Sequence, residues 1–192
     1  MSQAAGPALQ PGMAFPAFDL PALLPPREGQ EDYHPGRLTR QELPEGRPWL
    51  VYFYPRALTS GCTTQACALR DGLAAPDSVE RAHGLLVLGV SPDPGWRLKR
   101  FAEKERLNFP LLSDEDHRLA EACGVWQEKK LYGRVSMGIV RSSFLMDGAG
   151  IVQAVNPKVR AATHHDWLRQ TLQETPLPQP PGGQAGAKLQ AS

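Results

Sequence analysis

The sequence predicts an α/β fold with a central mixed sheet flanked by helices, and three observations support that prediction. Residues 49–54 and 85–90 form two continuous apolar runs, with the length and composition of strands covered on both faces. The stretch that follows each run has apolar residues at helical spacing. Further along, residues 143–147 and 151–155 flank a Gly-Ala-Gly turn, which is typical of a hairpin. Strands that alternate with helices indicate a layered α/β architecture.

Length and composition fit one globular domain with an extension at each end. The 192 residues are 41% hydrophobic and 21% charged, which suits a single core. Residues 1–12 are mainly Ala, Gln, Gly and Pro without periodicity, and residues 176–192 are rich in Pro and Gly. We expect both extensions to be disordered, so that residues 13–175 form the domain.

The charge balance excludes several classes of partner. Twenty-one basic and 20 acidic residues give a net charge of +1, without a Lys and Arg cluster suited to nucleic acid or a membrane surface. No apolar stretch approaches the ~20 residues that span a bilayer, and the N-terminus lacks a basic segment followed by an apolar core. We therefore expect a cytoplasmic monomer that acts on a small neutral substrate.

The first half of the chain offers three strands and two helices. Residues 15–21 alternate as a short edge strand does, whereas residues 25–48 contain five prolines and are interpreted as loop. The strand at 49–54 ends before a proline, and apolar spacing predicts a helix over residues 62–73, followed by a helical piece at 77–82. The strand at 85–90 is expected to pair beside the strand at 49–54.

The next helix has its own start signals. Asp93 and Pro94 supply an N-cap and a first-turn proline for a helix that extends to about Arg106. We expect its buried side to carry Trp96, Phe101 and Leu107.

The remaining elements complete the fold. Residues 108–112 predict a short strand, and a helix follows over about residues 113–123. After the hairpin, residues 163–173 predict a final helix with Trp167, Leu168 and Leu172 on its apolar face. A β-α-β half followed by a β-β-α half is what a thioredoxin-like fold requires.

The loop at residues 55–62 carries the candidate nucleophile. Cys62 opens a helix, where the positive end of the helix dipole and unpaired N–H groups favour thiolate over thiol. Gly61 leaves room for a ligand to approach the backbone, and Thr59 offers a hydroxyl near the same point. The alternative is that Cys62 is a small buried hydrophobe, as most free cysteines are.

The three cysteines are too few, and odd in number, for a secreted disulfide framework. They are therefore expected to be reactive or buried thiols in a reducing compartment. Zinc is the competing interpretation, but the spacing of Cys62 and Cys67 is loose for a zinc site. His164 and His165 point in different directions on a helix, and we expect them at the surface. We expect neither a metal nor a cofactor.

The motifs around Cys62 resemble those of the peroxiredoxins. Pro55, Thr59 and Cys62 have the spacing of the peroxiredoxin active-site motif. The segment Gly61-Cys62-Thr63-Thr64-x-Ala66-Cys67 is similar to the bacterioferritin comigratory protein, or peroxiredoxin Q, subgroup. The resemblance extends from about residue 15 to 172, with further matching segments at residues 89–93, 109–114, 124–130 and 132–145.

This resemblance implies a thiol-dependent peroxidase that reduces hydrogen peroxide and organic hydroperoxides and is recycled by a thioredoxin-like reductant. Cys62 is then the nucleophile, and Thr59 hydrogen-bonds the peroxide and the thiolate. Pro55 shields the sulfur from water, and Arg141 supplies the cation. The physical chemistry agrees for Arg141, because a guanidinium stays charged and can donate to the sulfur and an oxygen together.

The resemblance also implies that Cys67 resolves the sulfenic acid of Cys62 as an intramolecular disulfide. Cys123 competes for that role, but it precedes Gly124 where the family usually has tyrosine, and we interpret it as a buried helix-end residue. On a regular helix, Cα atoms five residues apart are separated by about 9 Å. A disulfide needs less than about 7 Å, so the pairing requires the helix to unwind.

Two functions of other classes are weighed against the peroxidase. One is a redox-sensing thiol–disulfide binding module without significant peroxidase turnover. The absence of a Cys-x-x-Cys motif weighs against a thioredoxin-type oxidoreductase. The other is a non-enzymatic scaffold with packing cysteines, which the joint presence of Thr59, Cys62 and Arg141 disfavours.

Overall fold

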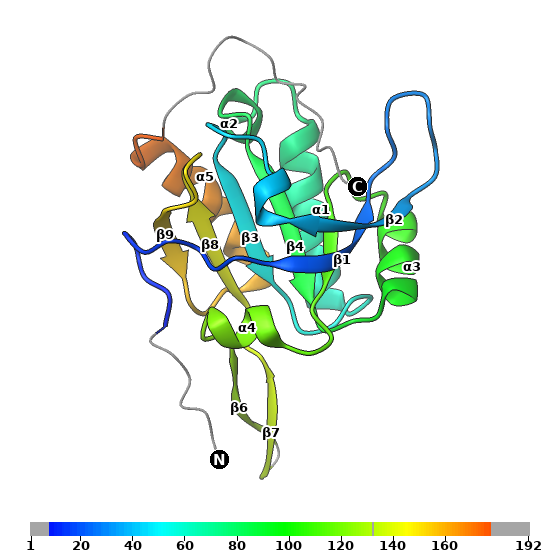
Figure 1. Cartoon of the computed structure of the whole chain (residues 1–192), viewed down its shortest axis with the longest axis vertical. Helices are drawn as coiled ribbons and strands as arrows, with labels where there is room; N and C mark the ends of the chain where they lie inside the picture. The colour runs from blue at the N-terminus through cyan, green and yellow to red at the C-terminus, as the bar shows by residue number, and fades with distance from the viewer. Residues whose placement is uncertain (1–7, 132, 178–192) are drawn as a thin grey trace.

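The computed structural model describes residues 8–131 and 133–177, and it confirms the predicted α/β fold. Within these residues, seven strands form one mixed sheet in the order β2-β1-β5-β4-β3-β8-β9 (Figure 1). The central strands β5, β4 and β3 are parallel, and the outer strands run antiparallel to their neighbours. The bounds are β1 Asp19–Leu24, β2 His34–Thr39, β3 Trp49–Phe53, β4 Leu86–Ser91, β5 Leu111–Ser113, β8 Ser142–Met146 and β9 Val152–Asn156.

Strand β3 lies inside this sheet and is buried at every position. Val51 and Phe53 belong to the hydrophobic core on one face of the sheet, whereas Leu50 and Tyr52 belong to the core on the other face. Because both faces are covered, the strand needs no alternation of apolar and polar residues.

The helices divide between the two faces. Helices α1, α3 and α5 contribute Leu69, Phe101 and Leu168 to one core, while α4 contributes Leu119 to the other. No helix within the described ranges is long and apolar enough to cross a membrane. The bounds are α1 Ser60–Ala74, α2 Val79–Ala82, α3 Gly95–Glu105, α4 Arg118–Ala122 and α5 His164–Glu174, with short 3₁₀ turns at Arg40–Glu42 and Ala161–Thr163.

The interpretation of residues 25–48 as loop is wrong, because this segment contains β2. Strand β2 pairs antiparallel with β1 along its whole length, and Leu38 is fully buried. The strand expected at residues 15–21 lies later, as β1. It contains Pro21, which is tolerated because β1 pairs with β5 only at Ala22 and Leu23.

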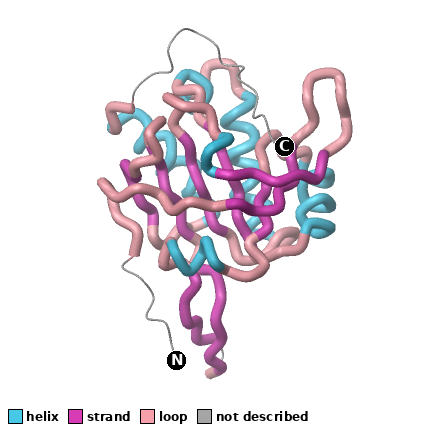
Figure 2. Tube along the Cα trace, viewed as in Figure 1, coloured by secondary structure: helices cyan, strands magenta, loops and turns pink. Residues whose placement is uncertain are grey.

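A separate two-stranded arm was not expected. Strands β6 (Trp126–Leu131) and β7 (Arg134–Ile139) form an antiparallel ribbon that extends away from the sheet (Figures 1 and 2). Val135 and Met137 are exposed on it.

The structured part of the chain also begins earlier than the expected boundary at residue 13. Leu9 is only 5% exposed and packs in the core, and the Gly12 N–H donates to the Val152 carbonyl at 2.8 Å. The expected disorder of residues 1–7 and 178–192 concerns residues outside the described part.

The predicted orientation of the α3 helix is wrong at Trp96, which is 63% exposed. The buried face carries Leu98, Phe101 and Ala102 instead. Trp96 lies two residues before Leu98, about 200° around the helix, and therefore faces the opposite side.

Candidate active site

Cys62 lies in the first turn of α1 and is completely buried. The chain leaves the end of β3, forms a short loop, and enters the helix at Ser60, two residues before the predicted start at Cys62. Thr59 occupies the N-cap position in an extended conformation. This geometry places the Cys62 sulfur beside the positive end of the helix dipole.

Arg141 reaches Cys62 from the link between β7 and β8. Its Nη2 atom donates to the Cys62 Sγ at 3.3 Å, and its Nη1 atom donates to the Gln65 Oε1 at 2.6 Å. The sheet register explains the meeting, because Ser142 pairs with Phe53 at the end of β3, directly before the loop that leads to Cys62. The structure therefore brings together two residues that the family resemblance had assigned to one site.

A buried polar chain continues behind Arg141. The Gln65 side-chain nitrogen lies 3.1 Å from the His164 Nδ1, and the His164 Nε2 lies 2.8 Å from the Ser143 hydroxyl oxygen. Since the Gln65 oxygen accepts from Arg141, its NH₂ group donates to Nδ1, so the proton of a neutral imidazole sits on Nε2. Burial, with Arg141 as the next contributor, lowers the pKa of His164 to about 3.

These hydrogen-bonded side chains correct one expectation and add residues that the sequence did not reveal. His164 is 1% exposed, so its predicted surface position is wrong. Gln65 lies one turn after Cys62 and is also buried, as is Ser143. A polar residue at i+3 from the nucleophile was a usable signal for Gln65, whereas His164 and Ser143 had none.

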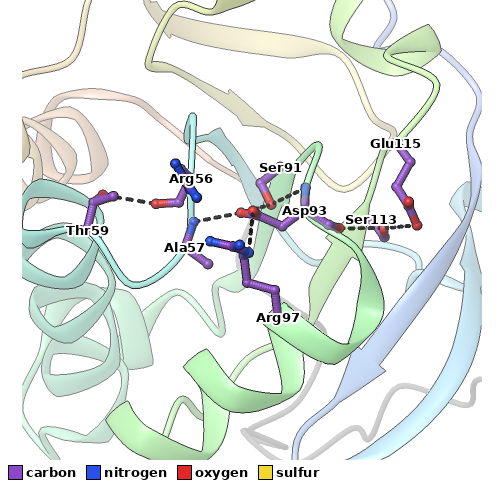
Figure 3. A network of polar contacts seen from close by, with 8 residues as sticks. All are labelled: Arg56, Ala57, Thr59, Ser91, Asp93, Arg97, Ser113 and Glu115. Atoms are coloured by element: carbon purple, nitrogen blue, oxygen red, sulfur yellow. Dashed lines mark hydrogen bonds and ion pairs between the residues drawn. The ribbon is translucent and has the colours of Figure 1, made fainter.

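Thr59 and Pro55 lie on the loop in front of Cys62. The Thr59 hydroxyl donates to the Arg56 carbonyl at 2.9 Å, within the same loop (Figure 3). Thr59 is exposed and Pro55 is half-buried.

Cys67 lies in the same helix as Cys62 but in a different environment. It is partly exposed, and its Sγ donates to the Glu105 carboxylate at 3.5 Å. Burial, together with Glu105, raises the pKa of the Cys67 thiol, while Arg70 opposes the shift. All three cysteines are free thiols.

Cys123 is the C-cap residue of α4 and is 1% exposed, as predicted for a buried helix end. Burial raises its pKa well above the usual range. It belongs to the core opposite the one that contains Cys62, so the sheet separates these two sulfurs.

One more cation belongs to the surroundings of the site. Burial, followed by the charge of Arg141, lowers the pKa of Lys129 on β6, and Cys62 acts in the opposite direction. Within the described residues, no group of three or more His, Cys, Asp or Glu side chains is arranged to hold a metal ion.

Known proteins resemble this chain in sequence. The model of the AhpC/TSA family matches residues 11–155. The chain is 51% identical over 128 residues to a putative peroxiredoxin bcp of Haemophilus influenzae, covering 65% of this chain and 80% of the relative. It is 49% identical over 130 residues to peroxiredoxin Bcp of Escherichia coli, covering 68% and 81%.

Solved structures also resemble this chain. One is a structure of the bacterioferritin comigratory protein of Xanthomonas campestris, which concerns the alkyl peroxide reduction activity of that protein. It superposes on this chain with a TM-score of 0.65 at 33% identity, covering 80% of this chain and 90% of that one. Peroxidoxin BcpB of Mycobacterium tuberculosis superposes with a TM-score of 0.64 at 30% identity, covering 86% and 97%.

Proposed function

The chain belongs to the AhpC/TSA family and, within it, to the Bcp and peroxiredoxin Q group of thiol peroxidases, and from this premise we propose how its residues perform the reaction. The protein reduces hydrogen peroxide and organic hydroperoxides through Cys62. The observation that carries this proposal is the 3.3 Å contact between the Arg141 guanidinium and the Cys62 sulfur at a helix N-terminus.

In the first step, the Cys62 thiolate attacks one oxygen of the hydroperoxide. The O–O bond breaks, the departing oxygen takes a proton to leave as water or an alcohol, and the sulfur becomes a sulfenic acid. Arg141 stabilises the charge that develops between the sulfur and the oxygens, and Gln65 holds its guanidinium in place. Thr59 orients the peroxide after its hydroxyl leaves the Arg56 carbonyl, and Pro55 limits access of water.

In the second step, Cys67 resolves the sulfenic acid. Its thiol loses the proton, its sulfur attacks the Cys62 sulfur, and water leaves as the disulfide forms. A dithiol reductant of the thioredoxin type then returns both cysteines to thiols and is itself oxidised. We place this cycle in a monomer in a reducing, cytoplasmic compartment.

The test is stopped-flow consumption of hydrogen peroxide by the pre-reduced protein. We expect a second-order rate constant orders of magnitude above that of a free thiol, because a preorganised cation and helix terminus favour both thiolate and transition state. The matched control is Cys62→Ser, which should consume no peroxide. A rate equal to that of a free thiol would favour the redox-sensing module instead.

A further inference from the structure

A buried carboxylate bonded to the active-site loop takes no part in the steps above. Asp93 follows β4 and is 6% exposed. We propose that Asp93 is a positioning residue, whose carboxylate holds the loop at residues 55–59 in the shape that presents Thr59 and Pro55 to the Cys62 sulfur. This inference rests on the proposed peroxidase function, because it concerns the same reaction.

The contact that carries the proposal joins Asp93 to the middle of the loop. The Asp93 Oδ2 accepts the backbone N–H of Ala57 at 2.6 Å (Figure 3). Ala57 is 1% exposed, so this N–H has no access to water. An N–H buried in this way needs a partner, and a charged acceptor makes one of the stronger hydrogen bonds in proteins.

Asp93 is itself fixed by three other elements of the fold. The Ser91 hydroxyl of β4 donates to Oδ2 at 3.0 Å, and the Ser113 hydroxyl of β5 donates to the Asp93 carbonyl at 2.7 Å. The Arg97 Nε of α3 lies 3.4 Å from Oδ1. Since none of these partners belongs to α1, the anchor of the loop does not depend on the helix that carries both cysteines.

The loop has a conformation that requires such an anchor. Leu58, the residue after Ala57, has a φ of 66°, in the left-handed region that a leucine rarely adopts. The Ala57 bond fixes the chain before this residue, and the Thr63 N–H, bonded to the Thr59 carbonyl at 2.9 Å, fixes it after.

Electrostatics alone does not explain a carboxylate here. A carboxylate carries a negative charge, and a negative charge does not favour a neighbouring anion. Arg97 offsets that charge by pairing with Asp93, and its guanidinium also lies over the Trp96 ring at 5.1 Å. The carboxylate therefore contributes through the hydrogen bond to the loop, not through its charge on the sulfur.

This distinction gives a test with two rates on one sulfur. Attack on peroxide needs the loop held in place. Alkylation of the buried Cys62 by iodoacetamide needs only a thiolate and an opening of the site, which a loosened loop does not hinder. In Asp93→Ala, the ratio of the peroxide rate to the alkylation rate should fall by about tenfold or more, because misplacing positioning groups by about 1 Å costs rates of that order. Asp93→Asn should restore most of the ratio, since the amide oxygen can still accept the Ala57 N–H.

Asp114 provides the matched control. It is 1% exposed, and its carboxylate accepts the backbone N–H groups of Leu119 and Ala120 at 3.2 and 2.8 Å, so this side chain anchors the start of α4 instead of the loop. Asp114→Ala should lower stability and leave the ratio unchanged. A wild-type ratio in Asp93→Ala, or an Asp93→Asn ratio as low as that of Asp93→Ala, would overturn the proposal.

A measurement on the unaltered protein covers the case in which Asp93→Ala does not fold. The Ala57 amide of the reduced protein should exchange with deuterium as slowly as the amides of β3, and fast exchange would overturn the proposal. Failure of the peroxidase function is distinguishable, because it would appear as a slow wild-type reaction with peroxide, whatever the variants do.

Discussion

Helix α1 holds two cysteines in opposite electrostatic surroundings. Cys62 is buried and receives a hydrogen bond from the cation Arg141, whereas Cys67 is partly exposed and donates one to the anion Glu105. A cation favours the thiolate of its neighbour, and an anion that accepts from a thiol favours the protonated form. One turn and a half of helix thus separates a sulfur beside a cation from a sulfur beside an anion, as the roles proposed for Cys62 and Cys67 require.

The same comparison explains why the two sulfurs do not meet in the reduced protein. Both lie within α1, where Cα atoms five residues apart are separated by about 9 Å. The far end of α1 packs against other elements, since Gly72 lies beside a pair formed by the Glu80 carboxylate and the His165 Nε2 at 2.7 Å. We therefore expect opening to begin in the first turns.

Replacing the sulfur of Cys62 should have the largest effect on activity. Cys62→Ser should abolish peroxidase turnover, because a serine hydroxyl is not ionised at neutral pH. Cys67→Ser should keep one fast reaction with peroxide and lose turnover with a dithiol reductant. Cys123→Ser, the control on the opposite face of the sheet, should retain most activity. Loss of turnover in Cys123→Ser but not in Cys67→Ser would reverse the assignment of the resolving thiol.

Replacing Arg141 changes the surroundings of Cys62 and leaves those of Cys67 as they are. Arg141→Ala should slow attack on peroxide by a factor of about a hundred to a thousand, the usual cost of losing one preorganised donor. Arg141→Lys should lose less, because a charge remains but the two-atom fork to Cys62 and Gln65 does not. Stopped-flow kinetics and ultraviolet thiolate absorbance measure both variants. An unchanged rate in Arg141→Ala would show that the contact is only structural.

The polar chain behind Arg141 predicts a specific acid sensitivity. The pKa of His164 is lowered to about 3 in the folded protein, whereas a histidine in the unfolded chain has a pKa near 6.5. As the pH falls, the unfolded chain therefore binds this proton first. Stability should therefore decrease between about pH 6.5 and 3, by up to about 1.4 kcal/mol per pH unit.

Substitution at His164 isolates this contribution. His164→Asn should unfold more easily at pH 7, by about 1–3 kcal/mol for the lost buried hydrogen bonds, and should show a flatter acid dependence in urea titrations. His34→Asn, at a partly exposed site on β2, should keep the wild-type slope. Equal slopes in wild type and His164→Asn would contradict the buried, neutral imidazole.

These residues also show what the sequence could and could not predict. Cys62 and Thr59 were local signals, since strand, loop and helix start follow one another in the chain. Arg141 came from the family resemblance, because no local pattern joins residues 79 apart. The contact between Gln65 and His164 spans 99 residues, and two adjacent histidines on a helix give no indication of which one is buried.

The elements of the fold also differ in how clearly the sequence predicts them. Continuous apolar runs predicted β3 and β4 closely, because burial on both faces leaves a strong signal. The ribbon of β6 and β7 was missed, since its exposed positions carry Glu128 and Lys130 and resemble a solvated loop. Strand β2 was missed because Pro35 and Gly36 within it mimic a turn.

Altering the anion beside the second sulfur should have the smallest effect. Glu105→Gln removes the charge that helps to raise the pKa of Cys67, and this pKa should fall toward its ordinary value. Alkylation of Cys67 at pH 7 should become faster by a small factor, measured by mass spectrometry, with the peroxide rate of Cys62 unchanged. Glu103→Gln on the exposed face of α3 is the control. Slower alkylation in Glu105→Gln would contradict the role given to this carboxylate.

Amide exchange in α1 tests most directly whether one helix must hold the two cysteines apart and then open to join them. The exchange of residues 62–72 should be slow in the reduced protein and accelerate strongly in the disulfide form, with a small loss of helical circular dichroism. Amides of β3 and β4 should not change. Equal protection of residues 62–72 in the two forms would contradict the account, because a disulfide between Cys62 and Cys67 cannot close within an intact helix.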